Sequence, residues 1–313
     1  MRLHDESTDA ARFDGHRSAS PARAGKRKFD DDDSLYDKRG HRQRLEVVED
    51  TPNGGDRWST WDQSTPLQKG PRPYPDWLVT ELAAVDRELG VLKTGKEADV
   101  YLVERGVPDT DRWCVLAAKR YRPPEHRMFH RDAGYLEGRR VRESRVNRAM
   151  AARTSFGKEA IAGQWASAEF AALCRLFEAG VPVPYPVQIL GTEVLLEFIG
   201  TADGERAAPR LAELRRDTAD LTDLWHQLML ALSTMARAGY THGDLSAYNL
   251  LVQDGRLVVI DLPQIVDIVA NPHGRDFVLR DARNVGAWFA SHGVAEANGD
   301  ELADLLCADA GLR

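Results

Sequence analysis

The sequence predicts an α+β fold of two lobes, with an N-terminal antiparallel sheet and one main helix, followed by a mainly helical and truncated C-terminal lobe. Two observations support this prediction. Short runs of β-forming residues, bounded by turn residues, occupy residues 91–198, with one long helical pattern among them. Helical periodicity dominates the remainder, where a single hairpin interrupts it.

Composition and charge suggest how the 313 residues are divided. Residues 1–70 hold charge blocks of both signs and few aliphatic residues, so we expect a disordered polar tail, although Trp58 and Trp61 favour packing of its end on the fold. Residues 71–200 would form an N-terminal lobe with a basic flexible insertion at 123–157, and residues 201–313 a C-terminal lobe. Because 42% of the residues are hydrophobic, a sizeable core is expected.

The chain shows no sign of secretion or membrane insertion. Its first residues lack the apolar core of a secretory signal, and no run approaches the roughly 18 apolar residues of a membrane span. We therefore expect a cytoplasmic protein without membrane contact. Three cysteines that lie far apart argue against a disulfide framework and a zinc cluster, and are expected to be buried apolar residues.

The first elements are a predicted helix and a predicted hairpin. Asp76 follows a proline, and the apolar residues behind it recur near helical spacing until Gly90: Trp77, Leu78, Leu82 and Val85. Two strands, 91–93 and 100–103, then flank a loop that contains Thr94, Gly95 and Lys96. Such a loop lets backbone N–H groups approach an anion, although a lone glycine in a hairpin is more often a simple turn.

A lysine in an apolar strand and a glutamate in a helix form the next candidate pair. Residues 115–119 predict a strand that ends on Lys119, and residues 164–179 predict a helix that includes Glu169. Because a lysine in an apolar strand is costly without an anionic partner, we expect the two to pair. The alternative is a surface lysine and a surface glutamate.

The segment from Lys119 to Lys158 is strongly basic. It holds twelve basic and four acidic side chains in a chain whose net charge is -7. This asymmetry suggests an anionic partner, either RNA or an acidic protein surface, and the alternative is a solvated flexible loop.

The proline-rich segment 181–186 predicts an extended connector into two strands, 187–190 and 194–198. Gly200 and the polar stretch through Arg210 are expected to form the hinge between the lobes. A buried helix is predicted over 221–235, and further helices over 276–291 and 299–307. Between them, residues 250–252 and 257–260 form a hairpin around Asp254-Gly255.

Three polar residues stand at one end of this hairpin: Asp244, Asn249 and Asp261. An Asp that accepts a proton, with an Asn five residues later and a second Asp that both hold Mg²⁺, suits phosphoryl transfer. The alternative is that they are ordinary turn and capping residues. Only 52 residues follow Asp261, so we do not expect a long peptide-binding groove.

Together these segments resemble the RIO family of atypical protein kinases over roughly residues 76–308. The resemblance rests on six motifs in family order: TGKEADVY at 94–101, AAKRYR at 117–122, WASAEF at 165–170, LLEFIG at 195–200, HGDLSAYN at 242–249 and IDLPQ at 260–264. The chain is most similar to the type 1 branch, because the polar N-terminal tail could not build the winged-helix domain of the second branch. The resemblance implies a protein-kinase-like fold.

The resemblance also implies roles for individual residues. Thr94, Gly95 and Lys96 would lie over the phosphates of ATP, and Lys119 with Glu169 would hold them. Glu197 and Ile199 would contact adenine. Asp244 would be the catalytic base, and Asn249 and Asp261 would bind Mg²⁺, or Mn²⁺ in its place. Asp261 would also be a phosphate acceptor.

One departure from the family pattern is Pro263, which stands where many relatives have a small polar residue. The long basic tail of some eukaryotic relatives is absent, which weakens the expectation of a small-ribosomal-subunit partner.

The leading hypothesis is an ATP- and Mg²⁺-dependent serine kinase or ATPase that acts on itself or on a protein partner, with RNA or a ribosomal particle as a candidate partner of Lys119 to Lys158. Two alternatives remain open. Small-molecule kinases of the aminoglycoside or choline type also use HGDL with a following Asn and Asp. A nucleotide-sensing scaffold would bind RNA or protein with negligible turnover.

Overall fold

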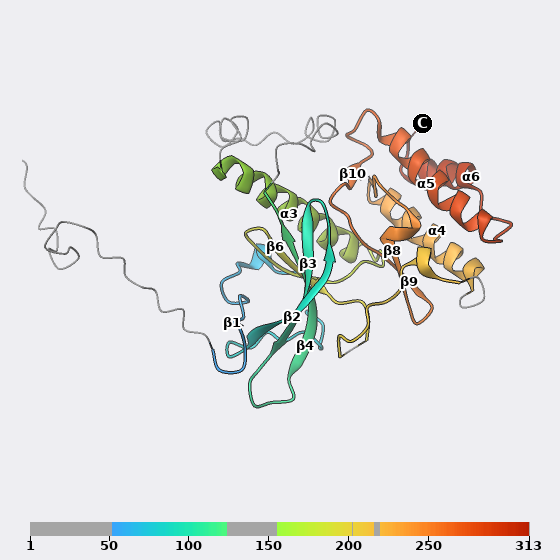
Figure 1. Cartoon of the computed structure of the whole chain (residues 1–313). Coiled ribbons are helices and arrows are strands. Elements are labelled where there is room, and N and C mark those ends of the chain that lie inside the picture. The colour runs from blue at the N-terminus through green and yellow to red at the C-terminus, as the bar shows by residue number, and fades with distance from the viewer. Residues whose placement is uncertain (1–51, 124–154, 202, 216–219, 313) are drawn as a thin grey trace, which may run out of the picture. The chain divides into compact units, whose positions relative to one another are not determined.

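The structure, a computed structural model, describes residues 52–123, 155–201, 203–215 and 220–312 (Figure 1). Most of the expected polar tail and of the basic insertion at 123–157 lies outside the described residues. Within the described ranges, no helix has the length and apolarity needed to cross a lipid bilayer.

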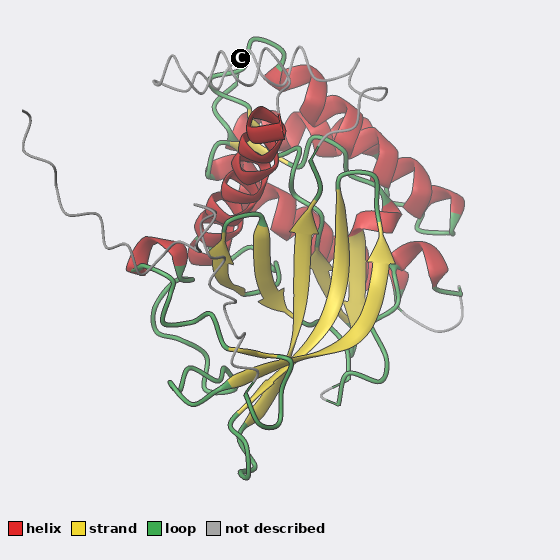
Figure 2. Ribbon diagram, turned by 60° about the vertical axis from the view of Figure 1, so that its left-hand side comes forward, coloured by secondary structure: helices red, strands yellow, loops and turns green. Residues whose placement is uncertain are grey.

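The N-terminal lobe is built on a six-stranded antiparallel sheet of order β1-β2-β3-β4-β6-β5 (Figure 2). Its strands are β1 Arg57–Trp58, β2 Val85–Thr94, β3 Ala98–Gly106, β4 Trp113–Tyr121, β5 Pro186–Leu190 and β6 Glu193–Glu197. The strands predicted at 91–93, 100–103, 115–119, 187–190 and 194–198 are therefore confirmed, and most are longer than predicted.

Both faces of this sheet are covered. Helix α3, Ser155–Glu178, packs on one face through Ala162, Ala166 and Phe170 (Figure 1). The other face is covered by residues 61–84, of which Trp61 and Val79 are buried. Because side chains alternate along a strand, β4 and β6 contribute to both cores.

The structure contradicts two predictions about the chain before β2. Residues 52–70 are not part of a disordered tail, since they contain β1 and the 3₁₀ helix η2, Pro66–Gln68. The predicted helix from Asp76 to Gly90 is also absent, because residues 76–84 form turns and β2 begins at Val85. Leu78 and its neighbour Val79 are both buried while Leu82 is exposed, which no helical face would produce.

The C-terminal lobe contains the predicted helices and hairpin. Its elements are η3 Leu211–Glu213, α4 Leu221–Arg237, β7 Tyr240–Thr241, η4 Ala247–Asn249, β8 Leu250–Gln253, β9 Arg256–Val259, β10 Val266–Asp267, α5 Gly274–Ser291 and α6 Gly299–Asp309. Strands β8 and β9 pair around the turn Asp254-Gly255, where both residues have positive φ, as the turn requires. Strand β7 pairs with β10, and this brings the chain after Asp261 back beside Thr241.

The last turns of α3 belong to the core of the C-terminal lobe. Leu173 and Leu176 pack in the same buried cluster as Leu228 of α4 and Phe289 of α5. The main helix of the N-terminal lobe therefore contacts both lobes, and it fixes Glu169 near the chain that follows β9.

Candidate active site

Three of the predicted site residues meet between the lobes. Lys119 Nζ donates a hydrogen bond to Glu169 Oε1 at 2.7 Å and to Asp261 Oδ1 at 2.9 Å. The lysine comes from β4, the glutamate from α3 and the aspartate from the residue two past β9. Two carboxylates thus compensate for the burial of the lysine, which would otherwise be costly.

The charges of this cluster support one another. Burial by itself would lower the pKa of Lys119, but Glu169 and Asp261 raise it above its ordinary value. Burial by itself would raise the pKa of Asp261, but Lys119, followed by Lys93, lowers it. Both groups are consequently charged at neutral pH, so that Asp261 presents an ionised carboxylate.

Two further groups hold Glu169 in place. The Tyr121 hydroxyl donates to Glu169 Oε2, and the backbone N–H of Leu262 donates to Oε1 at 3.2 Å. Burial raises the pKa of Tyr121 well above its usual value and the neighbouring Glu169 charge raises it further, so the hydroxyl keeps its proton. Sequence reasoning missed Tyr121.

Asp244 lies in the loop before η4 and Asn249 is the last residue of η4, and a hydrogen bond joins them. Asn249 Nδ2 donates to Asp244 O at 2.9 Å, which leaves Oδ1 of the amide as the atom suited to a cation. The N–H of Ile260 donates to Asn249 O at 3.0 Å, and His242 Nε2 contacts Ile260 O at 2.9 Å. The residue before Asp261 is thereby tied to the loop that contains Asp244.

The ring of His242 has a defined tautomer in this arrangement. Because Ile260 O only accepts, Nε2 must donate to it, and Nδ1 is then free to accept from the N–H of Asp244 at 3.3 Å. His242 is fully buried and organises the loop from within.

Asp281 of α5 anchors the same loop and was not predicted. Its carboxylate accepts from Thr241 Oγ1 at 2.9 Å, from Gly243 N at 2.6 Å and from Leu245 N at 3.0 Å. It is buried, and it lies on the apolar face of α5 with Val278 and Val285. A carboxylate in phase with core residues was the sequence signal that could have identified it.

The structure leaves other predicted residues outside the cluster. Thr94, the last residue of β2, and Lys96, on the loop that follows, are both exposed, and Gly95 N donates to Ala98 O at 3.0 Å. Arg122 donates to Gly95 O and pairs with Asp99, which holds the loop by its base. The residue of this segment that does reach the cluster is Lys93.

Glu197 and Ile199 lie where β6 leaves the sheet. The N–H of Glu197 donates to Tyr185 O, and its carboxylate accepts from Tyr185 N, both at 2.9 Å. Burial raises the pKa of Glu197, and the bond from Tyr185 N only partly opposes this. The carbonyl of Ile199 accepts from Ala208 N at 2.9 Å.

Metal binding would depend on oxygen ligands. The described residues contain no group of three or more His, Cys, Asp or Glu side chains that could hold a metal ion by themselves. Asn249 and Asp261 supply one amide and one carboxylate, the small protein contribution that Mg²⁺ accepts when phosphate oxygens and water complete its octahedron. The donor set therefore fits Mg²⁺ bound together with a nucleotide.

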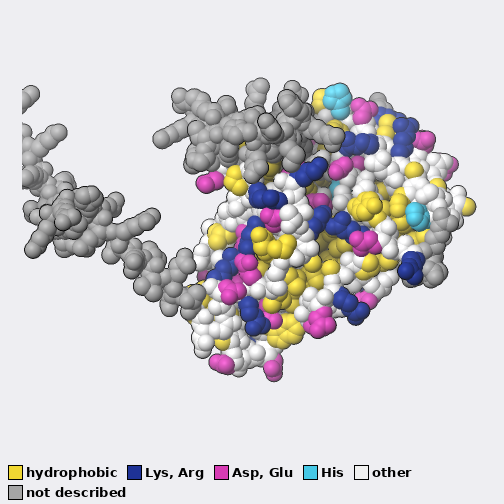
Figure 3. Space-filling view, viewed as in Figure 1, with side chains coloured by type: hydrophobic (Ala, Val, Ile, Leu, Met, Phe, Trp, Pro, Cys, Tyr) yellow, Lys and Arg dark blue, Asp and Glu magenta, His cyan; other side chains and the backbone are white. Residues whose placement is uncertain are grey.

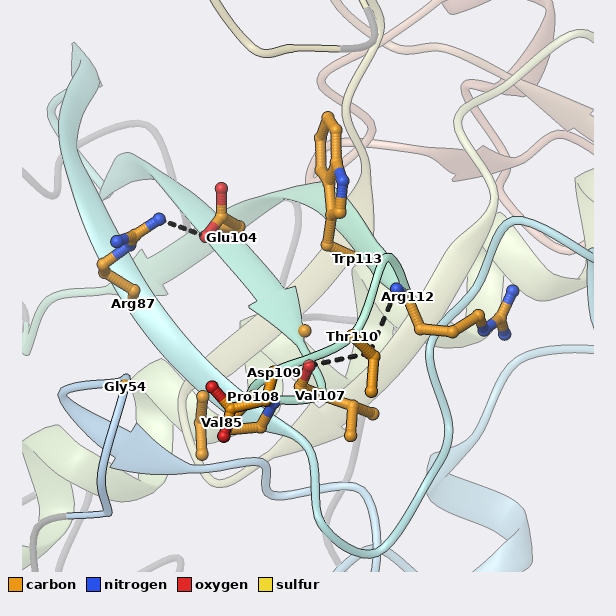
Figure 4. Close-up of a pocket in the computed structure, with 11 residues that line it drawn as sticks. Gly54, Val85, Arg87, Glu104, Val107, Pro108, Asp109, Thr110, Arg112 and Trp113 are labelled. Carbon is orange, nitrogen blue, oxygen red and sulfur yellow. Dashed lines mark hydrogen bonds and ion pairs between the residues drawn. The ribbon is translucent and has the colours of Figure 1, made fainter.

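A pocket of about 210 Å³ lies elsewhere, at the end of β3 and the turn before β4. Figure 4 shows that turn, where Thr110 accepts a hydrogen bond from Arg112 N and donates to Val107 O. None of the predicted site residues lines this pocket, and its polar groups bond to one another. The chemistry therefore identifies the Lys119 cluster, and not this pocket, as the candidate active site.

Comparisons with known proteins show the family of this chain. The RIO domain family model matches residues 125–302. The RIO-type serine/threonine-protein kinase Rio1 of Haloferax volcanii is 36% identical over 228 residues, which cover 72% of this chain and 71% of the relative. Serine/threonine-protein kinase RIO1 of Chaetomium thermophilum is 33% identical over 215 residues, which cover 66% of this chain but only 40% of the relative.

Among solved structures, the Rio2 kinase of Chaetomium thermophilum in an ADP/Mg²⁺-phosphoaspartate complex covers 70% of this chain and 62% of its own. Its TM-score is 0.48 at 19% identity. The assignment rests on the sequence matches, because the family model spans more than half of the chain and the Haloferax relative is covered over most of its length. This chain belongs to the RIO family of serine/threonine protein kinases, in its type 1 branch.

Proposed function

We propose that this protein transfers the γ-phosphate of ATP, with Mg²⁺, to itself or to a protein partner, and that the phosphoryl group passes through Asp261. The observation that supports this most is the ionised Asp261 carboxylate, which Lys119 of the other lobe holds at 2.9 Å. A nucleophile and its positive counter-charge are thereby in place before any substrate binds.

In this proposal each residue has a defined task. Lys119, fixed by Glu169, contacts the nucleotide phosphates, while Glu197 O and Ile199 N contact adenine. Thr94, Gly95 and Lys96 cover the phosphates through the loop that Arg122 holds. Asn249 and Asp261 would hold Mg²⁺, which when bound neutralises charge on the phosphate oxygens. Asp244 accepts the proton of the second nucleophile, which is a substrate hydroxyl or water.

The backbone at Asp261 supports a specialised role. Asp261 has φ of 65°, a left-handed conformation that is unfavourable for a residue with a Cβ atom. Such conformations persist where the surroundings enforce them, and they occur often at functional sites. Here Lys119 binds the side chain of Asp261, and Glu169 accepts from the N–H of Leu262, the next residue along the chain.

The test compares Asp244→Asn with Asp254→Asn, a matched change at the turn of the same hairpin. Removal of the base should lower turnover of radiolabelled ATP by about 100-fold or more, the usual range for a general base. Asp254→Asn should leave turnover unchanged, because asparagine suits the positive φ of that turn. Equal turnover in the Asp244 variant and the unmodified protein would sink the proposal.

The partner is a protein substrate or the protein itself, in the cytoplasm, and RNA or a ribosomal particle remains a candidate for the basic segment. In the described part of that segment, Arg120 pairs with Glu88 and Glu193, and Arg122 pairs with Asp99. On the face seen in Figure 3, basic side chains of the described residues alternate with acidic ones. RNA binding would therefore depend on the remaining arginines, and its affinity should fall steeply with salt.

A further inference from the structure

Lys93 of β2 reaches the candidate active site from the strand that precedes the phosphate loop. Its Nζ lies 3.9 Å from Asp261 Oδ2, on the side of the carboxylate that Lys119 leaves open. Asp261 is thus bracketed by two ammonium groups, one on each oxygen. Lys93 lies outside the six family motifs, and it has no task in the proposed function.

A β-bulge explains why Lys93 points into the site. In the pairing of β2 with β3, Val91 faces Tyr101 while Lys93 faces Val100, so that Leu92 is an extra residue. Val100 in turn faces Lys119 across β3 and β4. Because residues directly opposite one another share a face of the sheet, Lys93 and Lys119 project from the same face.

Without the bulge the lysine would point away. Lys93 would then pair with Asp99, whose partner on β4 is Arg120, in the row that faces the opposite side of the sheet. Bulges next to active sites commonly redirect a side chain in this way. The extra residue therefore directs a positive charge at Asp261.

The two lysines are held differently. Lys119 is 11% exposed and bonded to both carboxylates, so it is fixed in place. Lys93 is 41% exposed, and Asp261 is the one carboxylate within ion-pair distance of it among the described residues. A lysine that is held only loosely, at 3.9 Å, can follow a group that moves onto the carboxylate.

We propose that Lys93 is a second phosphoryl-binding lysine, which contacts the transferred phosphate as it moves from ATP to Asp261. The inference rests on the proposed function. In the first step an oxygen of Asp261 bonds to the γ-phosphorus while the bond from that phosphorus to the bridging oxygen breaks, and the electron pair leaves with ADP. In the second step water attacks the phosphorus, the bond to Asp261 breaks, and Asp244 takes the proton. Lys93 takes no part in proton transfer and neutralises the charge on the phosphoryl oxygens.

The experiment measures the rate of phosphoenzyme formation in a single turnover with γ-labelled ATP, together with nucleotide affinity by titration with a fluorescent ATP analogue. Lys93→Met should slow phosphoenzyme formation by about 10- to 100-fold, less than for a buried donor because the lysine is partly exposed. Nucleotide affinity should fall less than about 3-fold, since the contact forms mainly during transfer. Lys93→Arg should restore most of the rate.

Arg87→Met is the matched control, because it removes a positive charge from the same strand at a residue that pairs with Glu104. It should leave the rate unchanged. An unchanged rate in Lys93→Met would overturn the inference, and so would a faster rate, which would make Lys93 a restraint on Asp261. An equal loss of nucleotide affinity and of rate would show that Lys93 contributes only to nucleotide binding, which would also contradict the inference.

Asp261→Asn separates this inference from the proposed function. If Asp261→Asn forms labelled protein as fast as the unmodified chain, the proposed function fails, whatever Lys93 does. If label depends on Asp261 but not on Lys93, only the role of Lys93 is wrong.

Discussion

At the scale of single residues, Asp281 is the group whose removal should cost most outside the reacting cluster. It is buried, and it is the acceptor for two backbone N–H groups and one hydroxyl of the loop that contains Asp244. Asp281→Ala would leave three buried donors unsatisfied, at about 1–3 kcal/mol each and not fully additive. We expect the free energy of unfolding, measured in urea, to fall by about 3–5 kcal/mol.

A control variant, Asp304→Ala, shows whether the loss of stability is specific to Asp281. Asp304→Ala removes an exposed carboxylate of α6 and should change the free energy of unfolding by less than about 0.5 kcal/mol. The value of kcat should also fall in Asp281→Ala, because Asp244 loses its support. A loss of stability below about 1 kcal/mol would contradict the proposed anchoring role.

The site residues that the sequence predicted best are those that stand next to turns. Asp244 and Asp261 flank short elements whose ends are marked by Gly243, the turn at Asp254-Gly255 and Pro263, so their proximity could be expected. Lys93 could not be found in this way. Its direction depends on one extra residue in β2, and strand register is not visible in an isolated sequence.

At the scale of elements, β1 is a two-residue strand that Arg57 fastens to the sheet. Arg57 and Arg120 both donate to Glu193 of β6, each at 2.7 Å. Burial by itself would raise the pKa of Glu193, but the two arginines outweigh it and the pKa is lowered. The ion pairs should therefore stabilise the fold at neutral pH and weaken in acid.

The sign of this pH dependence follows from linkage. The pKa of Glu193 is lower in the folded than in the unfolded chain, where it is about 4.3. The ionised carboxylate therefore stabilises the fold above about pH 4.3, and this contribution is lost as the pH falls through the pKa of the folded chain. The difference in free energy of unfolding between the unmodified protein and Glu193→Gln should be largest near pH 7 and shrink below about pH 4. Urea titrations at several pH values measure it, and a difference that grows in acid would refute the assignment. With Arg57→Met as background, the same substitution should have a smaller effect.

The elements also show why residues 52–70 were mistaken for a tail. Their composition is polar, yet Thr60 and Ser64 accept hydrogen bonds from Gln188 Nε2 of β5. Gln188 Oε1 accepts in turn from Arg105, whose guanidinium also pairs with Asp86. A polar segment can thus be buried when every group finds a partner, and those partners lie up to 128 residues away. The long helices were predictable because their periodicity is local.

At the scale of the whole molecule, α3 joins the two lobes into one folding unit. Phe170 packs in the core against the sheet, whereas Leu173 and Leu176 pack in the core of the C-terminal lobe. The N–H of Val259 in β9 donates to the carbonyl of Pro182 in the connector at 2.8 Å, and Lys119 bonds to Asp261. Because α3 packs in both hydrophobic cores, unfolding of either lobe would expose apolar side chains of the other.

We therefore expect residues 52–312 to unfold in one cooperative transition despite the two-lobed architecture. In calorimetry the measured enthalpy should equal the van't Hoff enthalpy. Phe170→Ala in the sheet core and Phe289→Ala in the C-terminal core should each cost about 3–5 kcal/mol and should lower the same midpoint. Two separate transitions, with each variant lowering the midpoint of only one, would contradict this expectation. The lobes would then unfold independently, and the Lys119–Asp261 bond would join two separately stable units.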